Sequence, residues 1–264
     1  MEVKEVYKKI KNLEIQGAES VAIAGVRAIS LKGISVKKLL SLRPTEPMLY
    51  NAIKFAEKNG VKKTLYYIKE SKNKIIKLAY KKVGKKVFTH CHSSTVVDTL
   101  KYAKKHGKRF EVFVSETRPR YQGRKTAKEL SMSNIKVTTF VDSAAKSFIE
   151  KSDCVFLGMD AIITDNKGKI TGVVNKIGSS MFAEIAYDNN IPVYILGNSW
   201  KYSPKKLRIE ERDLEEVWKR MPNKIKVRNV AFDIIEPKHI KAIITELGFL
   251  TPKQLMNKVK EGYK

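Results

Sequence analysis

Three short segments of this sequence place polar side chains where apolar, strand-like runs end. The first is THCHSS, residues 89–94, which overlaps the end of the run KVFTH. The second is Gly-Met-Asp at 158–160, inside the apolar run DCVFLGMDAII. The third is GNSWK, residues 197–201, after PVYIL. Ligands of open α/β sheets bind at the carboxyl ends of parallel strands, so these segments are candidates for one site.

A cysteine and an aspartate in these segments are able to exchange protons with a substrate. Cys91 precedes a predicted helix, and a helix N-terminus lowers the pKa of a thiol. Asp160 lies in a predicted apolar strand, where a carboxylate is unfavourable unless it is paired or functional. The alternatives are a small buried apolar role for Cys91 and a helix cap or structural carboxylate for Asp160. His90 and His92 are more typical of structural positions.

Several residues are suited to binding a phosphate group. Ser93–Ser94 begin the predicted helix, whose free N–H groups and dipole favour an anion. Arg43, before Pro44-Thr45 at a junction of two predicted helices, offers a bidentate donor. Asn175–Lys176 precede a Gly-Ser-Ser helix start. In a chain this rich in lysine, Lys176 and Lys201 also fit surface positions when each is taken alone.

The scaffold for these groups is predicted from alternating strand and helix patterns after residue 82. Strand-like runs occur at 86–90, 109–116, 136–142, 153–163 and 192–200. Helical stretches occur at 93–107, 123–134, 143–152 and, for the most part, 173–190. This βαβ pattern predicts an α/β, Rossmann-like domain with a mostly parallel sheet. The remaining stretches at 208–220 and 239–248 are expected to pack back as helix and loop.

The residues before this alternation show helical patterns and no alternating strand pattern. Small and apolar residues recur at helical spacing over 17–33. A second helix is predicted from Pro47 to the stop signal Asn59-Gly60, and an amphipathic run fills 61–84. We therefore predict a helical N-terminal domain, residues 1–82, and a Rossmann-like domain, residues 83–264.

Composition narrows the class of protein. Of the 264 residues, 42% are hydrophobic, which is enough for a sizeable core. The chain has no run of about 20 apolar residues and no secretory signal at its charged amino terminus. Its two cysteines, Cys91 and Cys154, imply no disulfide framework, so we expect a cytoplasmic protein. The sequence has no GxGxxG and no P-loop, so no motif supports dinucleotide binding or NTP hydrolysis. It has no zinc-type Cys/His spacing, so no metal is predicted.

The charge is strongly positive, with 53 Lys and Arg against 27 Asp and Glu and a formal net charge of +26. Such a balance points to an anionic partner, either nucleic acid, an acidic protein or a phosphorylated metabolite. The basic residues are scattered through every segment and form no recognisable nucleic-acid motif. Dispersed surface charge is therefore favoured over a dedicated nucleic-acid face.

Five blocks of the sequence resemble one superfamily. This superfamily contains ribose-1,5-bisphosphate isomerase, methylthioribose-1-phosphate isomerase and the alpha, beta and delta subunits of translation initiation factor 2B. The blocks are SLRPTEPMLYNAI, THCHSSTVVDTL, ETRPRYQGRKTAKEL with VDSAA, GMDAII with VVNKIGSS, and KVRNVAFDI with IITELG. They occur in the family's order over residues 15 to 250, and the family fold has the two domains predicted above.

The resemblance implies roles for individual residues. In the isomerase branch the cysteine of the THCHS-like motif is the proton acceptor and the aspartate of the GxDxI-like motif is the proton donor, here Cys91 and Asp160. Non-catalytic initiation-factor subunits generally lack this pair. The substrate-binding positions of the branch fall on Gly17, Ala18, Arg43, Ser93, Ser94, Asn175, Lys176 and Lys201.

The expected activity is aldose–ketose isomerisation of ribose 1,5-bisphosphate to ribulose 1,5-bisphosphate, in nucleotide salvage of an archaeal-type cell. The resemblance implies no cofactor, activation by AMP, and a homo-oligomer, a hexamer built from dimers. One alternative is a non-catalytic regulatory subunit that binds initiation factor 2, and another is RNA binding through charge alone. The methylthioribose-phosphate branch fits less well because its N-terminus is typically longer.

The sequence departs from the isomerase pattern near its amino terminus. Gln16 stands where the isomerases usually carry an arginine, and Glu19 and Ser20 replace a glycine and an arginine. Val230 replaces a proline in the NPAFD-like motif. A phosphate contact that the missing arginine makes in the family would have to come from Arg27 or Arg43.

Overall fold

The computed structural model describes residues 3–12, 14–15, 17–43, 46–203, 207, 209 and 211–262, with side chains up to residue 259. Gln16, Pro44 and Thr45, which enter the predictions above, lie outside the described residues. Within the described ranges, no helix is both long and apolar enough to cross a membrane.

The N-terminal region is helical, as predicted, and strands begin only at residue 86 among the described residues. Its helices are α1 (Val3–Lys11), α2 (Ala18–Ala28), α3 (Val36–Ser41), α4 (Pro47–Asn59) and α5 (Val61–Ala79), followed by the 3-10 turn η1 (Tyr80–Lys82). Proline suits the first turn of α4 because its missing N–H has no helical partner there. Gly60, at φ 82°, ends α4 and directly precedes α5, so the two helices meet at a sharp corner.

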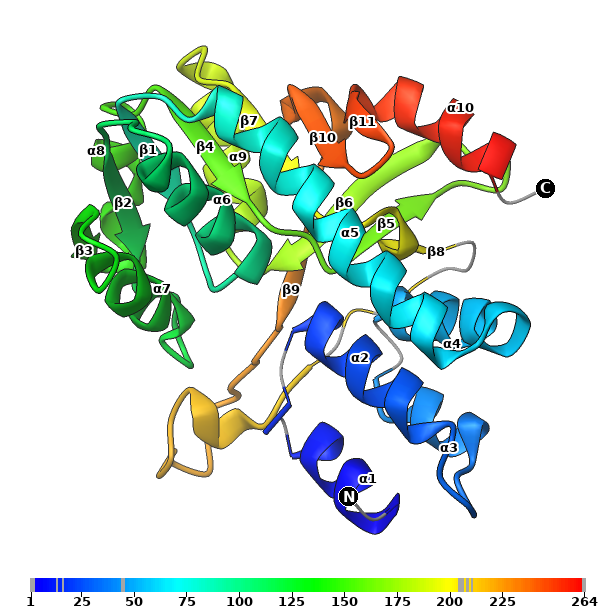
Figure 1. Cartoon of the computed structure of the whole chain (residues 1–264). Helices are drawn as coiled ribbons and strands as arrows, with labels where there is room; N and C mark the ends of the chain where they lie inside the picture. Colours follow the sequence, from blue (N-terminus) through cyan, green and yellow to red (C-terminus); the bar gives the residue numbers. More distant parts are fainter. Residues whose placement is uncertain are drawn as a thin grey trace.

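The centre of the molecule is a seven-stranded sheet in the order β11-β10-β7-β4-β1-β2-β3, and every pairing in it except β10 with β11 is parallel (Figure 1). Its strands are β1 (Lys86–Thr89), β2 (Glu111–Ser115), β3 (Lys136–Phe140), β4 (Cys154–Leu157), β7 (Val193–Leu196), β10 (Ala242–Thr245) and β11 (Gly248–Leu250). The prediction of an α/β fold with a helical N-terminal region and a mostly parallel sheet is confirmed.

Helices cover both faces of this sheet. They are α6 (Ser94–Lys105), α7 (Gln122–Ser131), α8 (Ala145–Ile149), α9 (Ser179–Asp188) and α10 (Pro252–Gly262). Alternate residues of each strand point to opposite faces, so Val87 packs with α5 and α6 while Phe88 packs with α9. The N-terminal helix α5 is therefore part of the wall over one face of the sheet.

A second sheet, absent from the sequence prediction, has the order β8-β5-β6-β9. Its strands are β5 (Ala161–Thr164), β6 (Ile170–Lys176), β8 (Tyr202–Ser203) and β9 (Phe232–Ile235). The single strand predicted over 153–163 was wrong, because the chain leaves the main sheet at Gly158 and enters the second sheet as β5. The predicted helical stretch over 173–190 was wrong in its first residues, which complete β6.

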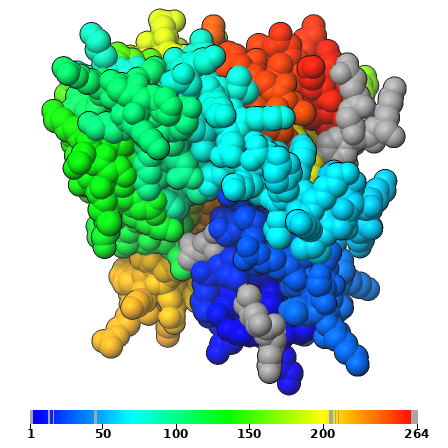
Figure 2. All heavy atoms as spheres, in the orientation of Figure 1, coloured from blue at the N-terminus to red at the C-terminus, as the bar shows by residue number. Residues whose placement is uncertain are grey.

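The C-terminal stretches also differ from the expectation of helix and loop. Residues 239–248 contain β10, whose four residues are all buried in the main sheet. A short apolar run of this kind fits a buried strand or a buried helix equally well, and the open position beside β7 selects the strand. The stretch 208–220 has only the 3-10 turn η4 (Leu214–Glu216) among its described residues, and its side of the molecule protrudes beside the N-terminal helices (gold in Figure 2).

The N-terminal helices join the sheet region through an aromatic cluster in which Trp200 is buried. The ring of Trp200, in the turn η3 (Ser199–Lys201), stacks 4.5 Å from that of Tyr67 in α5 and lies 5.0 Å from that of Phe55 in α4. The Asn51 side-chain amide of α4 donates to the carbonyl oxygens of Trp200 and Tyr202, at 2.7 and 3.0 Å. The division of the chain at residue 82 into two domains stays a prediction.

Candidate active site

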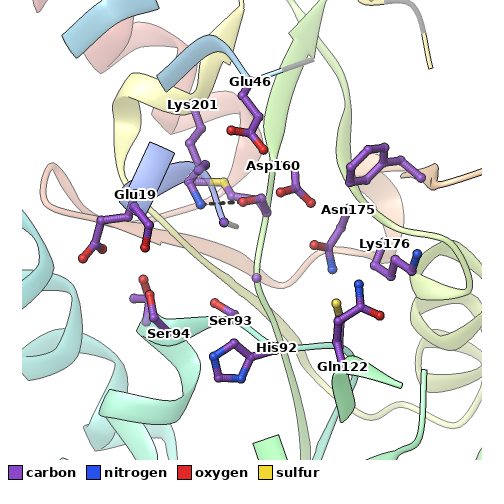
Figure 3. A pocket seen from close by; sticks show the side chains of 18 of the residues that line it. Glu19, Glu46, His92, Ser93, Ser94, Gln122, Asp160, Asn175, Lys176 and Lys201 are labelled. Carbon is purple, nitrogen blue, oxygen red and sulfur yellow. Dashed lines mark hydrogen bonds between the residues drawn. The ribbon is translucent and has the colours of Figure 1, made fainter. Parts of the chain in front are cut away.

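A cavity of about 320 Å³ lies between the N-terminal helices and the carboxyl ends of the main-sheet strands (Figure 3). All ten residues singled out from the sequence line it: Gly17, Ala18, Arg43, Cys91, Ser93, Ser94, Asp160, Asn175, Lys176 and Lys201. The reason is topological, because β7, β4 and β1 are adjacent parallel strands and their three polar segments emerge side by side. The expectation that these segments meet at one sheet edge is confirmed.

The backbone of Cys91 is held in an unusual conformation. Its φ is 65°, in the left-handed region that non-glycine residues seldom occupy. The Cys91 N–H donates to the Thr117 hydroxyl at 2.9 Å, and the Cys91 carbonyl accepts from the Thr126 hydroxyl at 2.8 Å. Strained backbone of this kind persists where surrounding contacts fix it, and it is frequent at functional sites.

The ionisation of Cys91 differs from the sequence expectation. Burial raises the pKa of the Cys91 thiol to about 11, while the backbone N–H of His92 and the charge of Lys176 act in the opposite direction. Helix α6 has its N-cap at Ser93, two residues beyond Cys91, so the thiol does not lie in the first turn of the helix. The prediction that the helix start lowers this pKa was therefore wrong.

Asp160 lies in the loop between β4 and β5 and not inside a strand, which corrects the sequence prediction. Its backbone N–H donates to the carbonyl of Val174 at 2.8 Å. Burial raises the pKa of the Asp160 carboxyl, and the charges of Lys201 and Arg43 oppose this rise. The arrangement favours a protonated carboxyl group more than an exposed aspartate does.

Cationic side chains lie on two sides of Asp160 (Figure 3). On one side Lys201 donates from Nζ to the Met159 carbonyl at 2.6 Å, and buried Arg43 forms an ion pair with Glu46. On the other side lies Lys176, which is 3% exposed and has no hydrogen-bond partner for Nζ among the described residues. Burial lowers the pKa of both lysines.

Neutral donors complete the wall. Gly17, at φ 84°, begins α2 without a side-chain cap, so the first N–H groups of that helix remain available beside the cavity. Ser93 is the N-cap of α6, and its hydroxyl accepts from the Val96 N–H. Asn175, at the end of β6, donates from Nδ2 to the Ser179 hydroxyl at 2.9 Å. Such groups suit a phosphorylated or hydroxylated ligand.

The two histidines of the THCHSS segment have different surroundings. His90 is buried, with Nδ1 2.6 Å from the Ser115 hydroxyl and Nε2 2.9 Å from the Ile177 carbonyl. Burial lowers the pKa of His90 to about 4, so it is a neutral structural residue. His92 lines the cavity. The Thr126 hydroxyl donates to the backbone carbonyl of Cys91, so it accepts a hydrogen bond from Nδ1 of His92.

Several lining residues were not singled out from the sequence as site residues. Gln122 and Lys125 belong to the ETRPRYQGRKTAKEL block, which marked their region but not their position in the cavity. Arg212 comes from the stretch expected to form a tail, and no sequence pattern marked it. Glu46 and Glu129 also line the cavity. No cluster of three or more His, Cys, Asp or Glu side chains placed to hold a metal ion occurs in the described ranges.

The sequence and the fold match one family of proteins. The Initiation factor 2 subunit family matches residues 34–252, and the chain belongs to this family. Among its relatives, the ribose 1,5-bisphosphate isomerase of Methanocaldococcus jannaschii is 35% identical, over 95% of this chain and 92% of the relative. The enzyme of the same name from Archaeoglobus fulgidus is 33% identical, over 96% and 90%. The alignment with the first relative is 289 residues long and this chain has 264, so at least 25 residues of the relative have no counterpart here.

Solved structures show the same fold. Translation initiation factor eIF-2B from Pyrococcus horikoshii superposes with a TM-score of 0.84 and 27% identity, covering 95% of this chain and 97% of that one. The 5-methylthioribose 1-phosphate isomerase of the same organism has a TM-score of 0.76 at 24% identity, covering 99% and 88%. The family thus contains proteins named as isomerases and proteins named as translation factors.

Proposed function

We propose that this protein is an aldose–ketose isomerase that converts ribose 1,5-bisphosphate to ribulose 1,5-bisphosphate, with Cys91 as base and Asp160 as acid. The observation that carries the proposal is the meeting of a thiol, a half-buried carboxyl group with a raised pKa, and cations on two sides in one cavity. Relatives named for this activity are 30 to 35% identical over nearly the whole chain. The cavity volume of about 320 Å³ is within the range of small-molecule sites.

The proposed proton transfers balance between the two groups. Protonated Asp160 gives its proton to the ring oxygen as the bond from that oxygen to C1 breaks. The Cys91 thiolate takes the proton from C2, and the electrons of that bond form the C1–C2 double bond. Asp160 then takes the proton of the C2 hydroxyl as the carbonyl forms, and Cys91 returns its proton to C1. Each group ends in its starting state, as a catalyst requires.

Direct turnover tests this proposal. Purified protein is incubated with ribose 1,5-bisphosphate, with and without AMP, and ribulose 1,5-bisphosphate is followed by NMR. We expect product from the wild type and a loss of at least about 100-fold in Cys91→Ser and Asp160→Asn. Cys154→Ser, at the other cysteine, is the matched control and keeps its activity. Absence of product from folded wild-type protein, or full activity in Cys91→Ser, contradicts the proposal.

The alternative is a non-catalytic regulatory subunit that binds initiation factor 2. It is favoured by the solved translation factor, whose TM-score of 0.84 exceeds that of the solved isomerase. The Cys91–Asp160 pair in the cavity favours the enzyme, because a binding surface needs neither group. A pull-down with initiation factor 2 separates the two: capture without turnover supports the subunit.

The wider expectations extend the same proposal. We infer a cytoplasmic enzyme of nucleotide salvage that needs no cofactor, is activated by AMP and assembles as a hexamer built from dimers. Exposed apolar side chains on two contacting elements, Met181 and Tyr187 of α9 and Ile234 of β9, are consistent with contacts between copies. Light scattering coupled to gel filtration measures the assembly, and a monomer at micromolar concentration contradicts it.

A further inference from the structure

Arg212 is placed in the cavity by a tightly held segment. Its backbone N–H donates to the Asn229 carbonyl at 2.9 Å, and residues 211 and 230 form an antiparallel bridge. Asn229 is 3% exposed and donates from Nδ2 to the Asp213 carbonyl at 2.7 Å and to Glu216 at 3.1 Å. Arg120, ahead of α7, fixes Glu216 through an ion pair of 3.0 Å. The position of Arg212 is thus built into the fold.

The side chain of Arg212 lies next to Lys176. Its guanidinium carbon is 5.4 Å from the centre of the Phe232 ring, and Phe232 pairs directly with Lys176 across β6 and β9. Residues that face each other in an antiparallel pair project to the same side of the sheet. All three residues line the cavity. The contact with the Phe232 ring therefore holds the Arg212 guanidinium near the buried ammonium group of Lys176.

The charges that surround Lys176, Arg212 among them, differ from those that surround Lys201. The charges that act on Lys176 come from Cys91, Arg212, Glu216 and Asp160, whereas those that act on Lys201 come from Asp160, Glu19, Glu46 and Lys72. Figure 3 shows Lys176 and Lys201 on opposite sides of Asp160. The cavity therefore has two separate cationic ends with the proposed acid between them.

The ammonium group of Lys176 has no hydrogen-bond acceptor among the described residues. Lys176 is 3% exposed, and a second cation lies beside it. A buried ammonium group without a partner is unfavourable, and a neighbouring like charge makes it more so. A dianionic phosphate that accepts hydrogen bonds from both side chains removes both penalties.

We propose that Arg212 and Lys176 form a second phosphate-binding end of the cavity, opposite the end formed by Arg43, Lys201 and the start of α2. Arg212 is then the residue that makes the site selective for a sugar with two phosphates over a sugar with one. This inference rests on the proposed function for its ligand class.

Binding measurements test Arg212 separately from turnover. Calorimetry of wild type and Arg212→Ala uses three probes: ribulose 1,5-bisphosphate, ribose 1-phosphate and ribose 5-phosphate. We expect Arg212→Ala to weaken bisphosphate binding by about 10- to 100-fold, the range for a hydrogen bond to a charged group. At least one monophosphate, bound at the Arg43–Lys201 end, keeps its affinity within about twofold. Arg212→Lys, which keeps the charge without the planar fork, is expected to fall between.

Arg220→Ala is the matched control, since Arg220 lies in the same segment and is exposed. It should leave all three affinities unchanged. The inference is overturned by unchanged bisphosphate affinity in Arg212→Ala, by equal weakening of all three probes, or by a wild type that binds one monophosphate as tightly as the bisphosphate. Failure of the proposed function is a different result: selective bisphosphate binding that depends on Arg212, without turnover, leaves this inference standing.

Discussion

At the scale of single residues, the environment of Cys91 controls when it can act as a base. Two threonine hydroxyls fix its backbone, and burial raises the pKa of its thiol to about 11, so the thiol is mostly protonated at neutral pH. The thiolate is the reactive form of cysteine, so the small thiolate fraction limits chemistry at this residue.

The thiol pKa of about 11 gives a direct prediction for the unliganded protein. The rate of alkylation of Cys91 by iodoacetamide should rise about tenfold for each pH unit between about pH 7.5 and 9.5, because the rate follows the thiolate fraction. The Cys154→Ser variant removes the other thiol, and mass spectrometry of the labelled peptide gives the rate. A plateau below about pH 9 contradicts the raised pKa.

Residue types and their positions after strand ends were enough to bring ten site residues to one cavity. The sequence could not give the ionisation of Cys91, because that depends on burial against segments that are distant in the sequence, such as those of Thr117 and Thr126. It could not give Arg212 either, since an arginine in an irregular segment resembles any other arginine of this basic chain. Both depend on tertiary contacts that no local pattern records.

At the scale of elements, the parallel strands were predictable and the strands of the second sheet were not. Strands β1, β2 and β3 alternate with helices, which is a strong local signal. Strands β4 and β5 form one continuous apolar run, and only the glycine at 158 marks the change of sheet. The apolar run within residues 239–248 is too short to show a clear periodicity, so only the available sheet position decides its structure.

Gly158 also sets how closely two elements approach beside the cavity. A Cβ atom at this position would lie 2.7 Å from the Cβ and 2.8 Å from the Oγ of Ser93. We therefore expect Gly158→Ala to push the start of α6 away from β4 and to lower the free energy of unfolding by about 1–3 kcal/mol, as overpacking does. Urea unfolding measures the change.

The double variant Gly158→Ala with Ser93→Gly gives a sharper test. Removing the Ser93 side chain relieves the collision, while glycine at an N-cap costs only about a few tenths of a kcal/mol. Stability should therefore recover toward that of Ser93→Gly alone. Additive losses in the double variant would show that the two positions do not collide. Activity is not expected to return, because Ser93 belongs to the proposed substrate-binding wall.

At the scale of the whole molecule, the cavity depends on how the N-terminal helices sit on the sheet region. Gly17, Ala18 and Arg43 come from the helices, and the remaining predicted site residues come from the sheet region. Trp200 fixes this arrangement through Tyr67 and Phe55, and it directly precedes Lys201. The packing of its ring against the N-terminal helices should therefore also affect the position of Lys201 in the cavity.

The chain has two tryptophans, which provides a matched pair of variants. Trp200 is 7% exposed, so Trp200→Ala should lower the free energy of unfolding by about 3–5 kcal/mol. Trp218 is 46% exposed, and Trp218→Ala should change it by no more than about 0.5 kcal/mol. Because the junction carries Lys201, Trp200→Ala should also weaken ribulose 1,5-bisphosphate binding at urea concentrations where the protein remains folded. Loss of stability with unchanged affinity would mean that the aromatic cluster holds the two parts together without setting the position of Lys201.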